Sequence, residues 1–122
     1  MICGVISLQA RMRFKFLENQ DERCYIEDFL SELDEETYLK ITNKLKDFES
    51  FDQVHLFRAE HIKKVEIGIY EVRVKVKGEC YRFLGKIDGE NFYIAHVYHK
   101  KSKKLPPKEI KTTRQRLITI NL

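Results

Sequence analysis

Hydrophobic and charged residues alternate along two stretches in the second half of the chain, which is the pattern of half-buried β-strands. Between residues 69 and 77 the apolar set is Tyr70, Val72, Val74 and Val76, and the charged set is Glu71, Arg73, Lys75 and Lys77. In the next stretch Tyr81 and Phe83 alternate with Arg82. Because alternate strand residues share a face, the pattern predicts two strands with one face in the core and one in water.

Two glycine-centred turns separate this region into three segments, because glycine readily adopts the backbone conformation of tight hairpins. The turns are Lys77-Gly78-Glu79 and Asp88-Gly89-Glu90. Residues 92–99 are apolar on both faces, which is typical of a more central strand. The end of that segment brings together His96, Tyr98, His99, Lys100 and Lys101. We therefore expect three consecutive strands joined by hairpins.

The first half of the chain changes from strand to helix periodicity. Residues 11–16 alternate strictly and predict a half-buried strand. Apolar residues at helical spacing then predict one helix around 26–33 and a second from Asp34 to about Glu49. Asp34 is a suitable N-cap for the second helix. Residues 50–67 have no clear assignment beyond an apolar lead into the sheet. Pro106 and Pro107 predict the start of a C-terminal helix.

The length of 122 residues and the 43% hydrophobic content suit one domain with its own core. We expect a single α+β domain over residues 1–122, in the order β-α-α-β-β-β-α, with residues 1–10 as a possible N-terminal extension. No window approaches the roughly 18 apolar residues that a membrane-spanning helix needs. The N-terminus lacks a basic region before its short apolar run, so we expect no signal peptide, no membrane partner and a cytoplasmic protein.

The net charge of +4 is distributed unevenly, with acidic residues concentrated in positions 18–60 and basic residues dominant from Ile62 onward. A basic half favours a polyanionic partner. Cys3, Cys24 and Cys80 have no CxxC spacing, and we expect reduced thiols. The four histidines show no metal-ligand spacing, so we expect neither a metal nor another cofactor.

Several residue groups recur in the order and spacing of a known family. They are Val65-x-x-Gly68-Ile69-Tyr70-Glu71-Val72-Arg73, then Tyr81-Arg82, then His96-x-Tyr98-x-Lys100-Lys101-x-x-Lys104-x-Pro106-x-x-Glu109-Ile110. The chain resembles the RelE/HigB superfamily of type II toxins, and within it the branch of phage-derived toxin-like proteins. The resemblance extends over residues 12–118 and is densest over 65–110.

This resemblance implies a RelE-like fold, with two N-terminal helices packed on a twisted antiparallel sheet and a C-terminal helix. It implies a ribosome-dependent, metal-independent endoribonuclease that cleaves messenger RNA. It also implies a cognate antitoxin, in this branch often a helix-turn-helix protein. The chain departs from the family's pattern at three positions: Gly85 replaces an aromatic residue, Leu105 a capping threonine and Thr113 a small alanine.

Such an enzyme must hold a phosphate, stabilise the transition state and move protons as the 2′-hydroxyl attacks phosphorus. We expect Arg73 and Arg82 to bind the phosphate, because they lie on adjacent strands and guanidinium groups donate paired hydrogen bonds. His99 is the preferred proton-transfer group, with His96, Tyr98 and Glu71 as alternatives. Tyr98 and Lys101 complete the expected catalytic set. The expected RNA-binding residues are Lys75, Lys100, Lys103, Lys104 and His96.

Other interpretations of the same residues stay open. Arg73 and Arg82 could be ordinary exposed strand residues paired with Glu71 and Glu79, because most surface charges have no function. His96 could be a half-buried histidine with a local hydrogen bond, and the lysine run a solvated loop. The whole chain could then be a non-catalytic relative that binds RNA or protein, or a structural phage protein.

Overall fold

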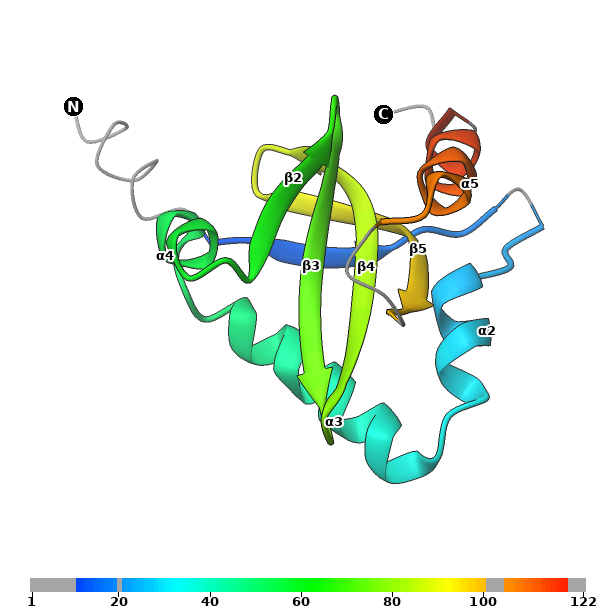
Figure 1. The fold of residues 1–122 in the computed structure, drawn as a ribbon, viewed down its shortest axis with the longest axis horizontal. Helices are drawn as coiled ribbons and strands as arrows, with labels where there is room; N and C mark the ends of the chain where they lie inside the picture. Colours follow the sequence, from blue (N-terminus) through cyan, green and yellow to red (C-terminus); the bar gives the residue numbers. More distant parts are fainter. Residues whose placement is uncertain (1–10, 20, 101–104, 119–122) are drawn as a thin grey trace.

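The computed structural model describes residues 11–19, 21–100 and 105–118, which form an α+β domain (Figure 1). The predicted extension, residues 1–10, and the site candidates Lys101, Lys103 and Lys104 lie outside the described residues. The strands are β1 (Arg13–Phe16), β2 (Ile62–Glu66), β3 (Ile69–Val76), β4 (Glu79–Asp88) and β5 (Asn91–His99). The helices are α2 (Tyr25–Ser31), α3 (Glu35–Phe48), α4 (Gln53–Arg58) and α5 (Pro107–Ile118).

The described strands form one sheet in the order β1-β5-β4-β3-β2. The strands from β2 to β5 pair with antiparallel neighbours, whereas β1 pairs in parallel with β5. The predicted α+β class, with N-terminal helices and a C-terminal helix on a mostly antiparallel sheet, is confirmed. The apolar character of β5 on both faces agrees with its place between β1 and β4.

The helices begin where the sequence supplies a cap. The Asp34 carboxylate accepts a hydrogen bond from the Thr37 amide at the start of α3, and the Cys24 thiol accepts one from Glu27 at the start of α2. The buried stripe of α3 and the apolar face of β3 and β5 share one core, in which Ile41 and Leu45 pack with residues such as Val97. The described helices include none that is long and apolar enough to cross a membrane.

Two elements that the sequence left unassigned, α4 and β2, fill residues 50–67. Helix α4 has six residues and buries only Leu56, so it is too short to show a helical period. Strand β2 is an edge strand that buries only Ile62 and carries a bulge between Lys64 and Glu66. The observed order therefore contains one helix and one strand more than the predicted order.

Gly85 marks a register shift between β4 and β5. A Cβ atom at this position would lie 1.9 Å from the backbone oxygen of Tyr93, which is far inside contact distance. An aromatic residue, as in the family's pattern, would not fit unless β5 moved. At the third departure, the buried Thr113 hydroxyl donates a hydrogen bond to the Glu109 carbonyl oxygen over 2.7 Å. The departures at Gly85 and Thr113 are therefore accommodated by local packing.

Candidate functional site

Strand register places a row of polar side chains across the face of the sheet on which α5 packs. Arg73 of β3 lies opposite Arg82 of β4, and Arg82 lies opposite Tyr98 of β5. We call these three residues the polar row. At the next position on the same face, Lys75 of β3 lies opposite Cys80 of β4. The backbone amide of Lys100 donates a hydrogen bond to the carbonyl oxygen of Cys80. The expected phosphate-binding arginines are thus brought together with Tyr98, Lys75 and Lys100.

A buried carboxylate joins the two arginines. Arg73 Nε donates to Glu71 Oε1 over 2.8 Å, and Arg82 Nη1 donates to Glu71 Oε2 over 2.7 Å. Glu71 is fully buried and the Arg82 side chain is only 5% exposed. The sequence pattern predicted that Glu71 and Arg82 face water, and this prediction is wrong for both residues. Burial of charges requires close pairing, so Glu71 fixes the positions of both guanidinium groups.

Two polar groups of the polar row are buried without a hydrogen-bond partner among the described residues. They are Arg82 Nε and the Tyr98 hydroxyl. Burial, followed by the negative charge of Glu71, raises the pKa of Tyr98 to about 12. Tyr98 is therefore neutral at physiological pH and has a hydrogen to donate. Because buried polar groups are normally paired, these two donors would be available to a ligand's acceptor only if the side chains that cover them moved.

Lys100 adds a further cation to this face. Partial burial lowers the pKa of its ammonium group, and the nearby charges of Arg82 and Arg73 lower it further. An ammonium group with a lowered pKa releases its proton more readily than an ordinary lysine does. Lys100 can therefore both neutralise a phosphate and serve as a proton donor.

His96 binds α5 to the sheet. Its Nε2 lies 2.9 Å from Glu109 Oε2, and its Nδ1 lies 3.1 Å from Arg116 Nη1. Because a guanidinium group only donates, Nδ1 must accept, and Nε2 carries the hydrogen that Glu109 accepts. Burial lowers the pKa of His96, which favours this neutral form. The ring also stacks beside Tyr98, with centroids 6.1 Å apart, so His96 positions the polar row.

His99 faces the other side of the sheet. It stacks on Tyr81 with ring centroids 5.0 Å apart, and its Nε2 pairs with Glu79. The structure therefore does not bring the preferred proton-transfer residue to the arginines. Among the described residues, no group of three or more His, Cys, Asp and Glu side chains is arranged to hold a metal ion.

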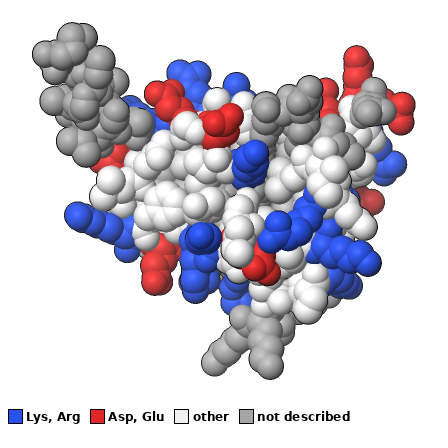
Figure 2. Space-filling view, turned by 90° about the horizontal axis from the view of Figure 1, so that it is seen from above, with Lys and Arg blue, Asp and Glu red and all other residues white. Residues whose placement is uncertain are grey.

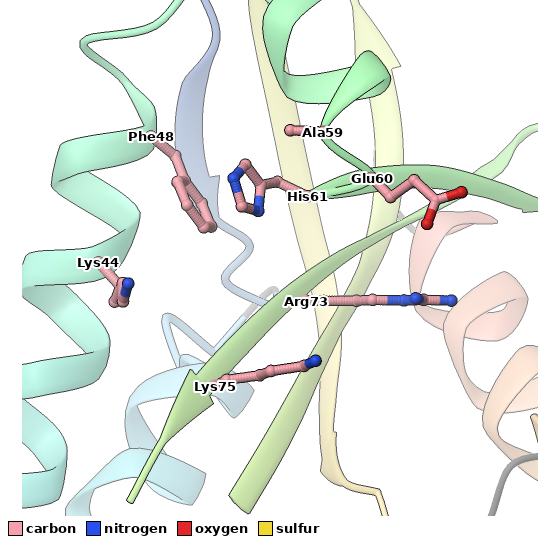
Figure 3. Close-up of a pocket in the computed structure, with 7 residues that line it drawn as sticks. All are labelled: Lys44, Phe48, Ala59, Glu60, His61, Arg73 and Lys75. Atoms are coloured by element: carbon pink, nitrogen blue, oxygen red, sulfur yellow. The ribbon is translucent and has the colours of Figure 1, made fainter. Parts of the chain in front are cut away.

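A pocket of about 250 Å³ lies beside the polar row and contains residues that the sequence did not single out (Figure 3). Its lining residues are Lys44, Phe48, Ala59, Glu60, His61, Arg73 and Lys75. Lys44 belongs to the polar side of α3, and His61 belongs to the unassigned segment. No local pattern indicated their closeness to Arg73, because it depends on how α3 packs against β3.

The surface charge around these residues is mixed. In the view of Figure 2, Lys and Arg side chains gather over the middle of the molecule, with single carboxylates between them. The local arrangement of cations therefore defines the candidate site better than the net charge of the chain does.

The fold and the polar row define an α+β domain with a cationic, partly buried site on its sheet. The family described as phage derived protein Gp49-like (DUF891) matches residues 28–118. The chain therefore belongs to this Gp49-like family, in agreement with the phage-derived branch that the sequence resembled. Comparisons with curated proteins and with solved structures gave no match. The matched range includes the whole polar row.

Proposed function

We propose that the chain is a type II toxin of the RelE/HigB kind, which cleaves ribosome-bound messenger RNA without a metal. The observation that carries this proposal is the convergence of Arg73 and Arg82 on one carboxylate beside the unpaired Tyr98 hydroxyl. The phage-derived family and the motif resemblance over residues 65–110 support it. A helix-turn-helix antitoxin is the proposed inhibitor.

In this mechanism the two arginines hold the scissile phosphate. A guanidinium group has five N–H donors, and Glu71 occupies one on each arginine in the observed contacts. The remaining donors, with the Tyr98 hydroxyl, bind non-bridging oxygens and stabilise the extra negative charge of the pentavalent transition state. The 2′-hydroxyl gives its proton to a solvent water as its oxygen bonds to phosphorus and the bond to the 5′-oxygen breaks, which leaves a 2′,3′-cyclic phosphate. Lys100 supplies the proton that the leaving 5′-oxygen gains.

The test is growth after induction of the wild-type chain, with mapping of messenger RNA ends in the same cultures. Wild type should arrest growth and create new ends within translated messages. Arg73→Lys and Arg82→Lys retain the charge but lose the planar fork, and each should lower the cleavage rate at least about tenfold. Arg13→Lys, at an exposed position on β1, is the matched control and should cleave as wild type does. Unchanged growth and intact messages with folded wild-type protein would refute the nuclease.

A non-catalytic module that binds RNA or a protein partner through the same surface is the second candidate. The observation that favours it is that Glu71 already pairs with both arginines, as in a structural ion-pair network. If the chain is such a binding module, the wild-type protein should bind its partner, and messenger RNA should stay intact after induction.

A further inference from the structure

A groove runs between α3 and the edge of β3. Strand β2 begins at Ile62, opposite Val72, and the Arg73 amide donates to the His61 carbonyl oxygen. Beyond this point, α3 rather than a strand lies beside β3, and two pockets adjoin there. The pocket of Figure 3 shares Lys44 and Lys75 with a second pocket, which is also lined by Lys40, Asn43, Asp47, Val76 and Lys77. We call the two together the edge groove.

The edge groove is cationic. Its lining contains Lys40, Lys44, Arg73, Lys75 and Lys77, against the carboxylates of Asp47 and Glu60. Lys40 and Lys77 are already paired with Glu36. Lys44 and Lys75 form no ion pair within the part of the chain that the structure describes, and both are exposed. These two lysines therefore present ammonium groups held in no ion pair, one on α3 and one on β3, in a lining where the cations outnumber the carboxylates.

An aromatic surface lies at the end of the edge groove nearest to α4. The His61 ring stacks on the buried Phe48 ring, with centroids 4.5 Å apart and planes inclined by 24°. Burial lowers the pKa of His61, and the nearby His55 and Lys44 lower it further, so the ring is neutral at physiological pH. Flat rings beside cations are the combination with which proteins bind single-stranded nucleic acids.

Arg73 connects the edge groove to the polar row, because its side chain both lines the pocket and pairs with Glu71. We infer that the edge groove binds the single-stranded RNA segment next to the phosphate held by the polar row. Lys44 and Lys75 neutralise its phosphates, and His61 stacks on one base. This inference rests on the proposed function, but it concerns binding and can be tested without cleavage.

The test uses fluorescence anisotropy with the full chain and a labelled single-stranded RNA about ten nucleotides long, long enough to span a site of this kind. All its riboses are 2′-O-methylated, so that it cannot be cleaved. Lys44→Ala and Lys75→Ala should each weaken binding several-fold and lower the slope of log Kd against log salt by about 0.7. Lys46→Ala, which removes the same charge from another face of α3, is the control and should bind as wild type does.

The stacking role has its own pair of variants. His61→Ala should weaken binding about tenfold, whereas His61→Phe keeps a flat ring and should restore it. Thermal unfolding of both variants is the control. If they unfold at the same temperature and only His61→Phe binds RNA as wild type does, the difference comes from the ring and not from a general loss of packing.

The outcomes separate this inference from the proposed function. If Arg82→Lys weakens RNA binding while Lys44→Ala and Lys75→Ala bind like Lys46→Ala, the edge groove inference is overturned and the toxin proposal stands. If folded wild type binds no RNA, the edge groove inference is overturned, whereas the toxin proposal, which concerns ribosome-bound messages, is decided by growth and message cleavage. An acidic peptide that binds the wild type more tightly than the RNA does, and loses affinity in Lys44→Ala, would assign the groove to a protein strand instead.

Discussion

Glu71 shows how one residue sets the geometry of the candidate site. It is fully buried, and its two oxygens accept hydrogen bonds from guanidinium groups of neighbouring strands. From the sequence it was one of several charged residues on a strand face expected to lie in water. Its burial could not be predicted from alternation, because its buried partner Arg82 lies on the next strand and meets it only when β3 and β4 pair.

Replacement of Glu71 should destabilise the fold. Glu71→Ala leaves Arg82 buried without its counter-charge, and the free energy of unfolding should fall by about 3 kcal/mol or more. Glu71→Gln keeps the shape and one acceptor oxygen, so its loss should be smaller. Urea unfolding measures both variants, with Glu90→Ala at an exposed turn as the control. A loss below about 1 kcal/mol for Glu71→Ala would show that the ion pairs are solvated.

His96 should make stability depend on pH. Burial lowers the pKa of His96 in the folded state, so the unfolded chain binds the proton more readily. Its stabilising contribution is then complete above the unfolded pKa of about 6.5 and is lost as the pH falls toward the folded pKa.

The measurement is urea unfolding of wild type and His96→Asn at about pH 8 and pH 5.5, a window set by the unfolded pKa of histidine. Wild type should lose more stability than His96→Asn over this interval. The loss that both proteins share includes the contribution of His61, whose pKa is also lowered by burial. Equal losses in the two proteins would contradict the assigned role of His96.

At the scale of secondary structure, local signals predicted the elements that carry their own caps and turns. Asp34 begins α3, Pro107 begins α5, and Gly78 and Gly89 occupy hairpin turns with positive φ. The elements α4 and β2 escaped prediction, because each buries a single residue and is stabilised by its neighbours. The parallel pairing of β1 with β5 also escaped, because nothing local specifies a partner that lies about eighty positions away in the chain.

The β4 position at the register shift with β5 should tolerate only glycine. Gly85→Ala places a methyl group against the Tyr93 carbonyl oxygen, and the free energy of unfolding should fall by about 3 kcal/mol. Gly89→Ala is the control, because a Cβ there has open space and only its positive φ of 62° opposes it, so a loss of about 1 kcal/mol is expected. Thermal or urea unfolding compares them. Equal losses would mean that β5 moves aside at little cost.

At the scale of the whole molecule, the sequence predicted that β3, β4 and β5 meet but not what their faces contact. Arg73, Arg82 and Tyr98 were all selected from the sequence, and strand register places them in one row. His99 was also selected, yet alternation along β5 directs it to the opposite face, beside Tyr81. Lys44 and His61 became visible only once α3 was packed beside β3. Three-dimensional packing, rather than any motif, therefore defines the edge of the candidate site.

The parallel pairing of β1 and β5 has a consequence for the timing of folding during synthesis. Residues 13–16 are made early, but their partners, residues 91–94, are made about eighty positions later. The polar row likewise lacks Tyr98 until β5 has been made. Because β1 gains its partner strand and the polar row its third member only then, we expect a nascent chain to remain without a working site until β5 has been synthesised. A protein proposed to attack translated messages would thus be unable to act while the strands before β5 are being translated.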